Sequence, residues 1–153
     1  GMAEAYDLFT PDAGELAFLA DDLAPHPFYT RGFILHEEQK VSDLIARAYR
    51  YKNAARILLV KGQVDYVAGA QGAFATIDSP DEEALEPIGG TGDTLTGIVS
   101  ALAAGGMEMG RAAALAARAN RIAGCLAAPT PMTQVSDIIA CIPEAVAQVL
   151  EMP

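Results

Sequence analysis

The sequence predicts an α/β fold in which helices pack on a sheet that has parallel strands and a β-hairpin. Three observations lead to this prediction. Residues 57–60 are a short apolar run between charged residues, which is typical of a buried parallel strand. Residues 64–77 alternate loosely and contain a glycine-rich turn, which predicts a hairpin. From residue 91 onward, apolar side chains recur at helical spacing.

The N-terminal segment predicts a strand, a turn and a helix. Residues 8–9 indicate the end of a short buried strand. The following turn contains Pro11 and leads into a helix that starts near Glu15. Thr10 or Asp12 is expected to cap this helix, because short polar side chains accept hydrogen bonds from the first N–H groups of a helix.

The middle of the chain predicts a loop over residues 21–33, a helix over 37–53 and an acidic loop over 79–87. The last turn of the helix is basic, which suits the negative end of its dipole. His26 and His36 have no partner at metal-ligand spacing, so no metal site is expected.

The C-terminal part predicts helices over residues 91–104 and 110–128, then an element over 134–141 and a helix over 143–150. Gly105 and the next glycine are expected to end the first of these helices. The second helix is rich in alanine, and its small side chains permit close packing against its neighbours.

Composition restricts the class of protein. The chain of 153 residues is 52% hydrophobic, which predicts one globular domain over residues 1–153. The formal net charge of −10 argues against a nucleic-acid or anionic-membrane partner. Without a membrane-length apolar run or a secretory leader, a cytoplasmic location is expected. In that reducing compartment Cys125 and Cys141 are expected to be buried helix thiols.

A glycine-rich turn at Gly89, Gly90, Thr91 and Gly92 runs directly into the helix that is expected from residue 91. The first N–H groups of a helix have no internal partner and its dipole favours negative charge, so this turn predicts a phosphate site. Asp93 lies in the first turn of the helix. Its carboxylate either caps the helix or takes a proton from a substrate hydroxyl held beside a phosphate.

Lys61 ends the strand predicted over residues 57–60. Open α/β sheets bind ligands beyond the carboxyl ends of their strands, so Lys61 is a candidate phosphate contact. A strand-end lysine in solvent is the alternative. The acidic loop at 79–87 leads straight into the predicted phosphate site.

The stretch that begins at Gly89 resembles the anion-hole motif of ribokinase-like kinases, and the residues after Asp93 are most similar to the ATP- or ADP-dependent NAD(P)H-hydrate dehydratases of that superfamily. Further matches follow in family order: Thr10-Pro11, Gly14-Glu15, Leu59–Gly62, Gly90–Asp93, Ser136-Asp137 and Pro143-Glu144. Together they correspond to the C-terminal half of a dehydratase domain. The resemblance therefore implies a truncated ribokinase-like sheet.

The resemblance also implies roles for individual residues. Gly89, Gly90, Thr91, Gly92 and Lys61 would contact the phosphates of ATP or ADP, bound with Mg²⁺. Asp93 would act as the catalytic base, and Thr10 and Glu15 would contact the substrate, hydrated NADH or NADPH.

The chain departs from the family pattern in three places. Asp12 stands where dehydratases have histidine, Cys125 stands where they have an acid, and the loop 79–87 is acidic instead of small and open.

Three interpretations follow. The chain is a reduced dehydratase or kinase that becomes complete by assembling, or a non-catalytic half-domain that acts as a subunit or interaction module. The third is a plain α/β module in which Asp93 only caps a helix. A half domain exposes a sheet edge and an apolar face, so we expect a homo-oligomer or a partner chain that supplies the missing half.

Overall fold

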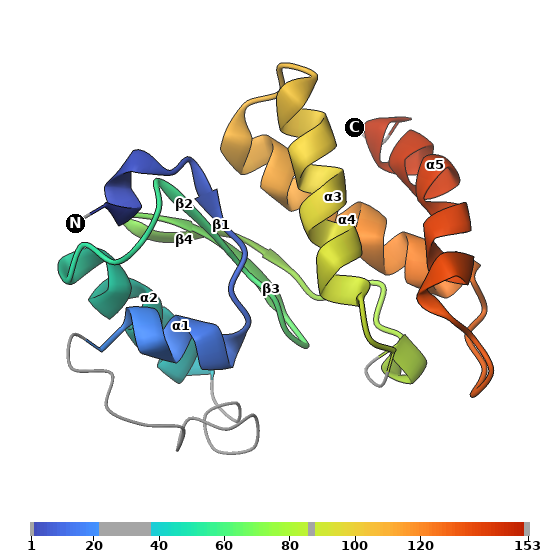
Figure 1. The fold of residues 1–153 in the computed structure, drawn as a ribbon, viewed down its shortest axis with the longest axis horizontal. Coiled ribbons are helices and arrows are strands. Elements are labelled where there is room, and N and C mark those ends of the chain that lie inside the picture. The colour runs from blue at the N-terminus through green and yellow to red at the C-terminus, as the bar shows by residue number, and fades with distance from the viewer. Residues whose placement is uncertain (1, 22–37, 86–87, 152–153) are drawn as a thin grey trace. The chain divides into compact units, whose positions relative to one another are not determined.

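The computed structural model describes residues 2–21, 38–85 and 88–151 (Figure 1). The chain divides into two compact units, residues 1–76 and 77–153. Their described residues form a four-stranded sheet with one parallel strand pair and five α-helices, so the predicted α/β class is confirmed and is consistent with a truncated ribokinase-like fold.

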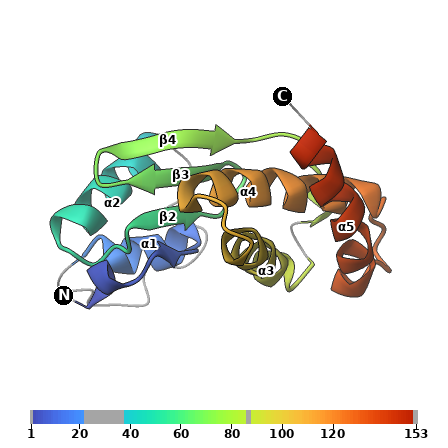
Figure 2. The same cartoon turned by 90° about the horizontal axis from the view of Figure 1, so that it is seen from above.

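The first unit is built on a sheet whose strands follow one another in the order β1-β2-β3-β4 (Figure 2). The strands are β1 (Leu8–Phe9), β2 (Ile57–Val60), β3 (Asp65–Gly69) and β4 (Gly72–Ile77). β1 and β2 are parallel with Leu8 opposite Ile57, and β2 and β3 are antiparallel with Leu59 opposite Val67. The parallel strand over 57–60 and the hairpin are therefore where the sequence predicts them.

Two helices, α1 (Ala13–Leu19) and α2 (Glu38–Arg50), pack beside this sheet, and a 3-10 turn at Ala3–Ala5 precedes it (Figure 1). Their contact buries a continuous apolar core: Leu16, Ala17, Ala20, Val41, Leu44, Ile45, Ala48, Ala54, Leu58, Val60, Tyr66 and Ala68. Removing this apolar surface from water is what holds the helices to the strands.

The hydroxyl of Tyr49 ties α2 to the sheet. It lies 3.0 Å from the carbonyl oxygen of Ala68 and 3.2 Å from that of Arg56. Burial raises the pKa of Tyr49 to about 12, because the ionised phenolate would lose its hydration. The neutral hydroxyl is therefore the form that joins helix and strands.

In the second unit, residues 77–85 and 88–151 form a 3-10 turn at Glu83–Leu85 and three helices, α3 (Thr91–Ala104), α4 (Met109–Leu126) and α5 (Val135–Glu151). α4 packs against both α3 and α5. Every buried residue of α4 is alanine or glycine, which lets the neighbouring helices approach closely. Gly105 and Gly106 end α3 as predicted, with Gly106 in the left-handed region at φ 91°.

The helix prediction for the C-terminal residues is wrong in one respect. Proline at 143 was expected to begin a separate helix, but α5 continues through it from residue 135 to 151. Proline removes one helical hydrogen bond and crowds the preceding turn. Ile138 and Val149, buried on either side of it, hold both halves of the helix in place.

Other predictions differ in detail or lie outside the described residues. Cys125 and Cys141 are both on helices but half-buried, not fully buried. The loop at 22–33, both histidines and residue 37 lie outside the described residues. Among the described helices, none has both the length and the apolar character that a membrane span requires.

Candidate functional site

Gly90 begins α3 with the left-handed backbone conformation that glycine favours, at φ 100°. A Cβ at this position would lie 3.1 Å from Cγ2 of Val135, so space as well as conformation favours glycine. The carbonyl oxygen of Gly90 accepts hydrogen bonds from the N–H groups of Asp93 and Thr94, each at 3.0 Å. These two backbone hydrogen bonds close the tight turn.

The next two N–H groups, those of Thr91 and Gly92, donate to no acceptor among the described residues. Such groups at the start of a helix point away from it along the axis, and the helix dipole adds partial positive charge there. An anion at the N-terminal end of α3 would therefore meet unsatisfied donors. The phosphate site at this helix start stays a prediction.

Asp93 is exposed in the first turn of α3. Its carboxylate forms no hydrogen bond or ion pair with the described residues, and no side chain caps the helix at Gly90. The hydrogen bond that a capping role for Asp93 predicts is therefore not made within the described part of the chain. The carboxylate is available to a ligand beside the glycine turn.

Asn120 is a residue of this site that the sequence analysis missed. From α4 it donates a hydrogen bond from Nδ2 to the carbonyl oxygen of Thr91 at 3.2 Å, and its Oδ1 accepts from the hydroxyl of Thr94 at 2.6 Å. These bonds hold the first turn of α3, which carries Asp93. The available signal was a single amide side chain within an alanine-rich helix.

Two hollows lie beside the glycine turn within the second unit. The first, of about 420 Å³, lies between α3 and α5 and is mainly apolar; its lining includes Gly90, Asp93, Gly97 and Ile139. The second, of about 510 Å³, is lined by Ala84, Ile88, Gly89 and residues 129–131 and 133–135. A ligand on the turn therefore has room on either side for a non-anionic group.

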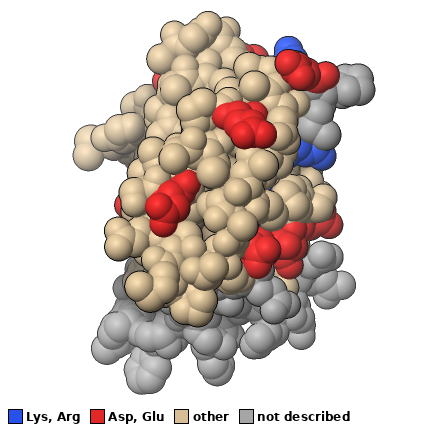
Figure 3. All heavy atoms as spheres, turned by 90° about the vertical axis from the view of Figure 1, so that its right-hand side faces the viewer, with Lys and Arg blue, Asp and Glu red and all other residues tan. Residues whose placement is uncertain are grey.

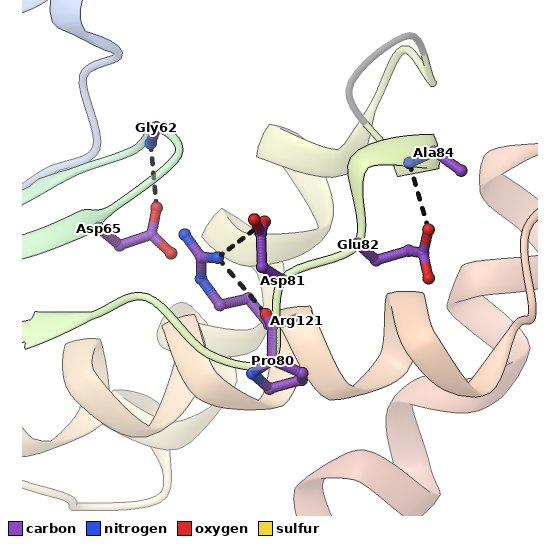
Figure 4. A network of polar contacts seen from close by, with 7 residues as sticks. All are labelled: Gly62, Asp65, Pro80, Asp81, Glu82, Ala84 and Arg121. Atoms are coloured by element: carbon purple, nitrogen blue, oxygen red, sulfur yellow. Dashed lines mark hydrogen bonds and ion pairs between the residues drawn. The ribbon is translucent and has the colours of Figure 1, made fainter. Parts of the chain in front are cut away.

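The acidic segment before the turn is held by α4 (Figure 4). The Arg121 guanidinium, with little exposure, lies 3.5 Å from the carbonyl oxygen of Pro80 and 3.9 Å from Oδ1 of Asp81. Leu85 packs so closely on α4 that a Cβ at Gly124 would overlap its Cδ1. The wall of the second hollow is thus fixed by tertiary contacts.

Cys125 cannot stand in for the family acid as a charged group. Burial raises the pKa of its thiol above the ordinary 9.0, and the carboxylates of Glu82 and Asp81 raise it further. The thiol is therefore protonated at neutral pH. Glu82 itself accepts a hydrogen bond from the N–H of Ala84 (Figure 4).

In the first unit, the predicted residues lie together at the carboxyl ends of β1 and β2. The N–H of Lys61 donates to the carbonyl oxygen of Pro11 at 2.8 Å, and Asp12 and Lys61 form a parallel β-bridge. The segment from Thr10 to Asp12 therefore lies beside the end of β2. Lys61 is half-buried, and its ammonium group has no ion pair with the described residues. The N–H of Gly62, next to it, donates to Asp65 at 3.0 Å (Figure 4).

Of the two residues predicted as the cap of α1, Thr10 and Asp12, the structure shows Asp12 in this role. Its Oδ1 accepts from the N–H of Glu15 at 2.8 Å, and the Glu15 carboxylate accepts from the N–H of Asp12 at 2.7 Å. This reciprocal pair is a capping box. Glu15, predicted to contact the substrate, is exposed but already engaged in the cap.

The predicted site residues therefore form two groups. Thr10, Glu15 and Lys61 lie at one edge of the sheet in the first unit. Residues 89–93 lie at the start of α3 in the second unit. No cluster of three or more potential metal-ligating side chains occurs among residues 2–21, 38–85 and 88–151.

Comparison with known proteins gives a consistent picture. A family model described as NAD(P)H-hydrate dehydratase matches residues 3–144. An uncharacterized protein of Methanocaldococcus jannaschii is 42% identical over 151 residues, which is 98% of this chain and 65% of that protein. The bifunctional NAD(P)H-hydrate repair enzyme Nnr of Hyperthermus butylicus is 36% identical over 115 residues, which is 71% of this chain and 21% of that enzyme.

The chain thus spans less than two thirds of the length of either of these relatives. No solved structure matches it significantly.

Proposed function

The chain belongs to the NAD(P)H-hydrate dehydratase family, and from this premise we propose that it binds ADP or ATP at the start of α3. In this proposal the nucleotide acts with Mg²⁺ in the repair of hydrated NADH or NADPH. The amides of residues 90–92 receive a phosphate, and Asp93 takes the proton from the hydroxyl of the hydrate. The hydroxyl oxygen accepts the terminal phosphoryl group of the nucleotide, and the shortened nucleotide leaves. Loss of the phosphate from the substrate, with a proton from the neighbouring ring carbon, then restores NADH or NADPH.

One observation carries the proposal. The turn ends in two unsatisfied N–H groups, and the adjacent carboxylate of Asp93 has no partner among the described residues. A phosphate needs donors, and a catalytic base needs a free carboxylate within reach of the substrate. Both requirements meet within four residues of one helix turn.

The remaining candidate residues are assigned to contacts with the substrate and with the rest of the nucleotide. The hollow lined by Gly89 and by residues 129–131 and 133–135 has the size for a nucleoside, and its lining combines apolar with polar side chains. For the first unit, the family resemblance supports a phosphate contact by Lys61 and substrate contacts by Thr10 and Glu15. Glu15 must then leave its bond to the N–H of Asp12 or accept a second donor.

A second candidate is a non-catalytic half-domain that serves as a subunit or interaction module. The acidic segment favours it, because Asp81 is fixed by Arg121 ahead of the glycine turn. Carboxylates near a nucleotide repel its phosphates unless Mg²⁺ bridges them. For the isolated chain we therefore expect weak or absent turnover.

Calorimetry with ADP, ATP, AMP and tripolyphosphate tests nucleotide binding. ADP and ATP are expected to bind, and Gly92→Val is expected to weaken both, since a branched side chain blocks the approach of phosphate to the backbone. Failure of all four to bind at millimolar concentration would remove the nucleotide from the proposal.

Recovery of NADH absorbance from its hydrate, with nucleotide and Mg²⁺, tests catalysis. Activity that Asp93→Asn abolishes would establish the enzyme and refute the non-catalytic candidate. Activity that is equal in wild type and Asp93→Asn would refute the role of Asp93. Nucleotide binding without activity in either protein would favour the non-catalytic subunit.

Three further predictions stay part of this proposal. Both units act together as one domain that resembles the C-terminal half of a dehydratase. The protein works in the cytoplasm, where the NAD(P)H pool of the cell is repaired. It completes its site as a homo-oligomer or with a partner chain.

A further inference from the structure

We propose that Asn120 is a positioning residue, which orients the N–H of Gly92 toward a phosphate group and strengthens it as a donor. Asn120 lies in α4, and its side chain reaches the first turn of α3. The inference rests on the proposed function for the identity of the ligand. The contacts that carry it lie within α3 and α4, and one of its two tests needs no ligand.

The N–H of Gly92 belongs to the same peptide group as the carbonyl oxygen of Thr91. In a planar trans peptide these two groups point in opposite directions, so a bond that fixes the carbonyl also fixes the N–H. Nδ2 of Asn120 donates to this oxygen at 3.2 Å, and the hydroxyl of Thr94 lies 2.8 Å from it. At the other end of the peptide, the N–H of Gly92 donates to no acceptor among the described residues.

The amide of Asn120 fits this place in only one orientation. A backbone carbonyl can only accept, so the amide nitrogen faces Thr91 and the amide oxygen faces the hydroxyl of Thr94, 2.6 Å away. The hydroxyl has one hydrogen, and the shorter contact indicates that it donates to the amide oxygen. Thr94 is buried, so water has little access to these bonds. The three residues therefore form one connected network that holds the Thr91 carbonyl.

Packing of α4 on α3 does not by itself require an amide at this position. Every buried residue of α4 is alanine or glycine, and α3 packs against this helix. A polar side chain in such a contact costs free energy unless it is hydrogen-bonded, whereas an apolar side chain would pack without that cost. What the amide adds is direction and polarity, because a carbonyl that accepts hydrogen bonds makes the N–H of its own peptide a better donor.

The charges of the second unit make this effect important for a phosphate. Residues 88–106, which include α3, contain no lysine, arginine or histidine. The basic residues of the unit are Arg111, Arg118 and Arg121, all in α4, and Arg121 holds the acidic segment. Figure 3 shows a face of the molecule on which acidic side chains stand apart on a largely uncharged surface. Phosphate binding at the glycine turn therefore depends on how well the backbone N–H groups are directed.

The amide nitrogen of Gly92 in the heteronuclear NMR spectrum of the ligand-free chain reports on the bond to the Thr91 carbonyl. Asn120→Ala is expected to move this signal upfield, because a carbonyl that loses a donor polarises its peptide less. Thr96→Val is the matched control, since the hydroxyl of Thr96 donates at 3.0 Å to the carbonyl oxygen of Gly92, which belongs to the next peptide. This variant should shift the signal of Asp93 and leave that of Gly92 in place.

Calorimetry with tripolyphosphate measures the consequence for binding. Asn120→Ala should weaken binding about tenfold, which corresponds to about one hydrogen bond, and Thr96→Val should bind like the wild type. Asn120→Leu fills the space of the amide without its polar atoms. It should give the same two results as Asn120→Ala, and it takes the place of that variant if circular dichroism shows the alanine variant to be unfolded.

A Gly92 signal that both Asn120 variants leave unchanged would overturn the positioning role, whatever the chain binds. Equal affinity of the wild type and both variants for tripolyphosphate would overturn it as well, while leaving the proposed function intact. A shifted Gly92 signal in a chain that binds no phosphate compound would instead refute the proposed function, and with it the phosphate as the group that the oriented N–H meets.

Discussion

Replacing Gly90 by alanine should destabilise the protein, whereas the same change at its neighbour Gly89 should not. At Gly90 the backbone has φ 100°, and an added Cβ would lie 3.1 Å from Val135. The left-handed conformation costs a non-glycine residue about 1–2 kcal/mol, and the crowding adds about 1 kcal/mol. At Gly89 a Cβ meets nothing within 4 Å, and its φ lies outside the left-handed range.

Gly89→Ala should therefore be neutral or stabilise by up to about 1 kcal/mol, because alanine restricts the unfolded chain. The difference in the free energy of unfolding between the two variants is then about 3 kcal/mol, or roughly 6–12 °C in Tm for a chain of this size. Urea unfolding followed by circular dichroism measures it. Equal stability of the two variants would refute the conformation assigned to the glycine turn.

Three further substitutions test individual contacts. Tyr49→Phe should lower the free energy of unfolding by about 1 kcal/mol, because the hydroxyl bonds are lost. The absorbance titration of the variant should lack the phenol that ionises with a pKa of about 12. Because the folded pKa is raised, the hydroxyl stabilises the protein fully below pH 10, and this stabilisation is lost as the pH rises further. Glu108→Ala should lower the Tm at neutral pH, since both carboxylate oxygens accept bonds from the N–H groups of Gly110 and Arg111 at 2.8 Å. Those bonds lower the pKa of Glu108, so the Tm difference should be complete above the ordinary value of 4.5 and vanish as the pH falls through the lowered one. Asn120→Ala should cost about 1–2 kcal/mol in chemical unfolding, and in combination with Thr94→Val the losses should not add, because the two side chains share a hydrogen bond.

Much of the fold was predictable because its signals are local. The apolar run at Ile57–Val60 has the length of one strand, and charged residues mark its ends. The helix after the glycine turn was predicted with its full bounds, because glycines mark both of its ends. α5 was harder to predict. The cost of a proline inside a helix can be inferred from the sequence, but the burial of Ile138 and Val149 that offsets it depends on tertiary packing.

The candidate site likewise has a local part that the sequence predicts and a non-local part that it does not. The glycine turn and Asp93 are contiguous in sequence, so their pattern is visible without a structure. Asn120 lies 29 residues from Thr91, whose carbonyl oxygen it contacts. Nothing in the spacing of the two residues indicates that α4 returns to the first turn of α3. The ion pair of Arg121 with Asp81 is equally non-local, so the acidic loop could be predicted but not what holds it.

The starts of α1, α4 and α5 differ from the start of α3. In α1 the carboxylate of Asp12 accepts a backbone N–H, in α4 that of Glu108 accepts two, and in α5 that of Asp137 accepts the N–H of Gln134. α3 also has an acidic residue in its first turn, yet among the described contacts Asp93 accepts none. A glycine at the cap position leaves the N–H groups open at a cost in helix stability, because side-chain caps stabilise a helix by about 1 kcal/mol. An uncapped start is useful only if another acceptor takes the place of the cap, and a phosphate is the acceptor that such a helix start binds best.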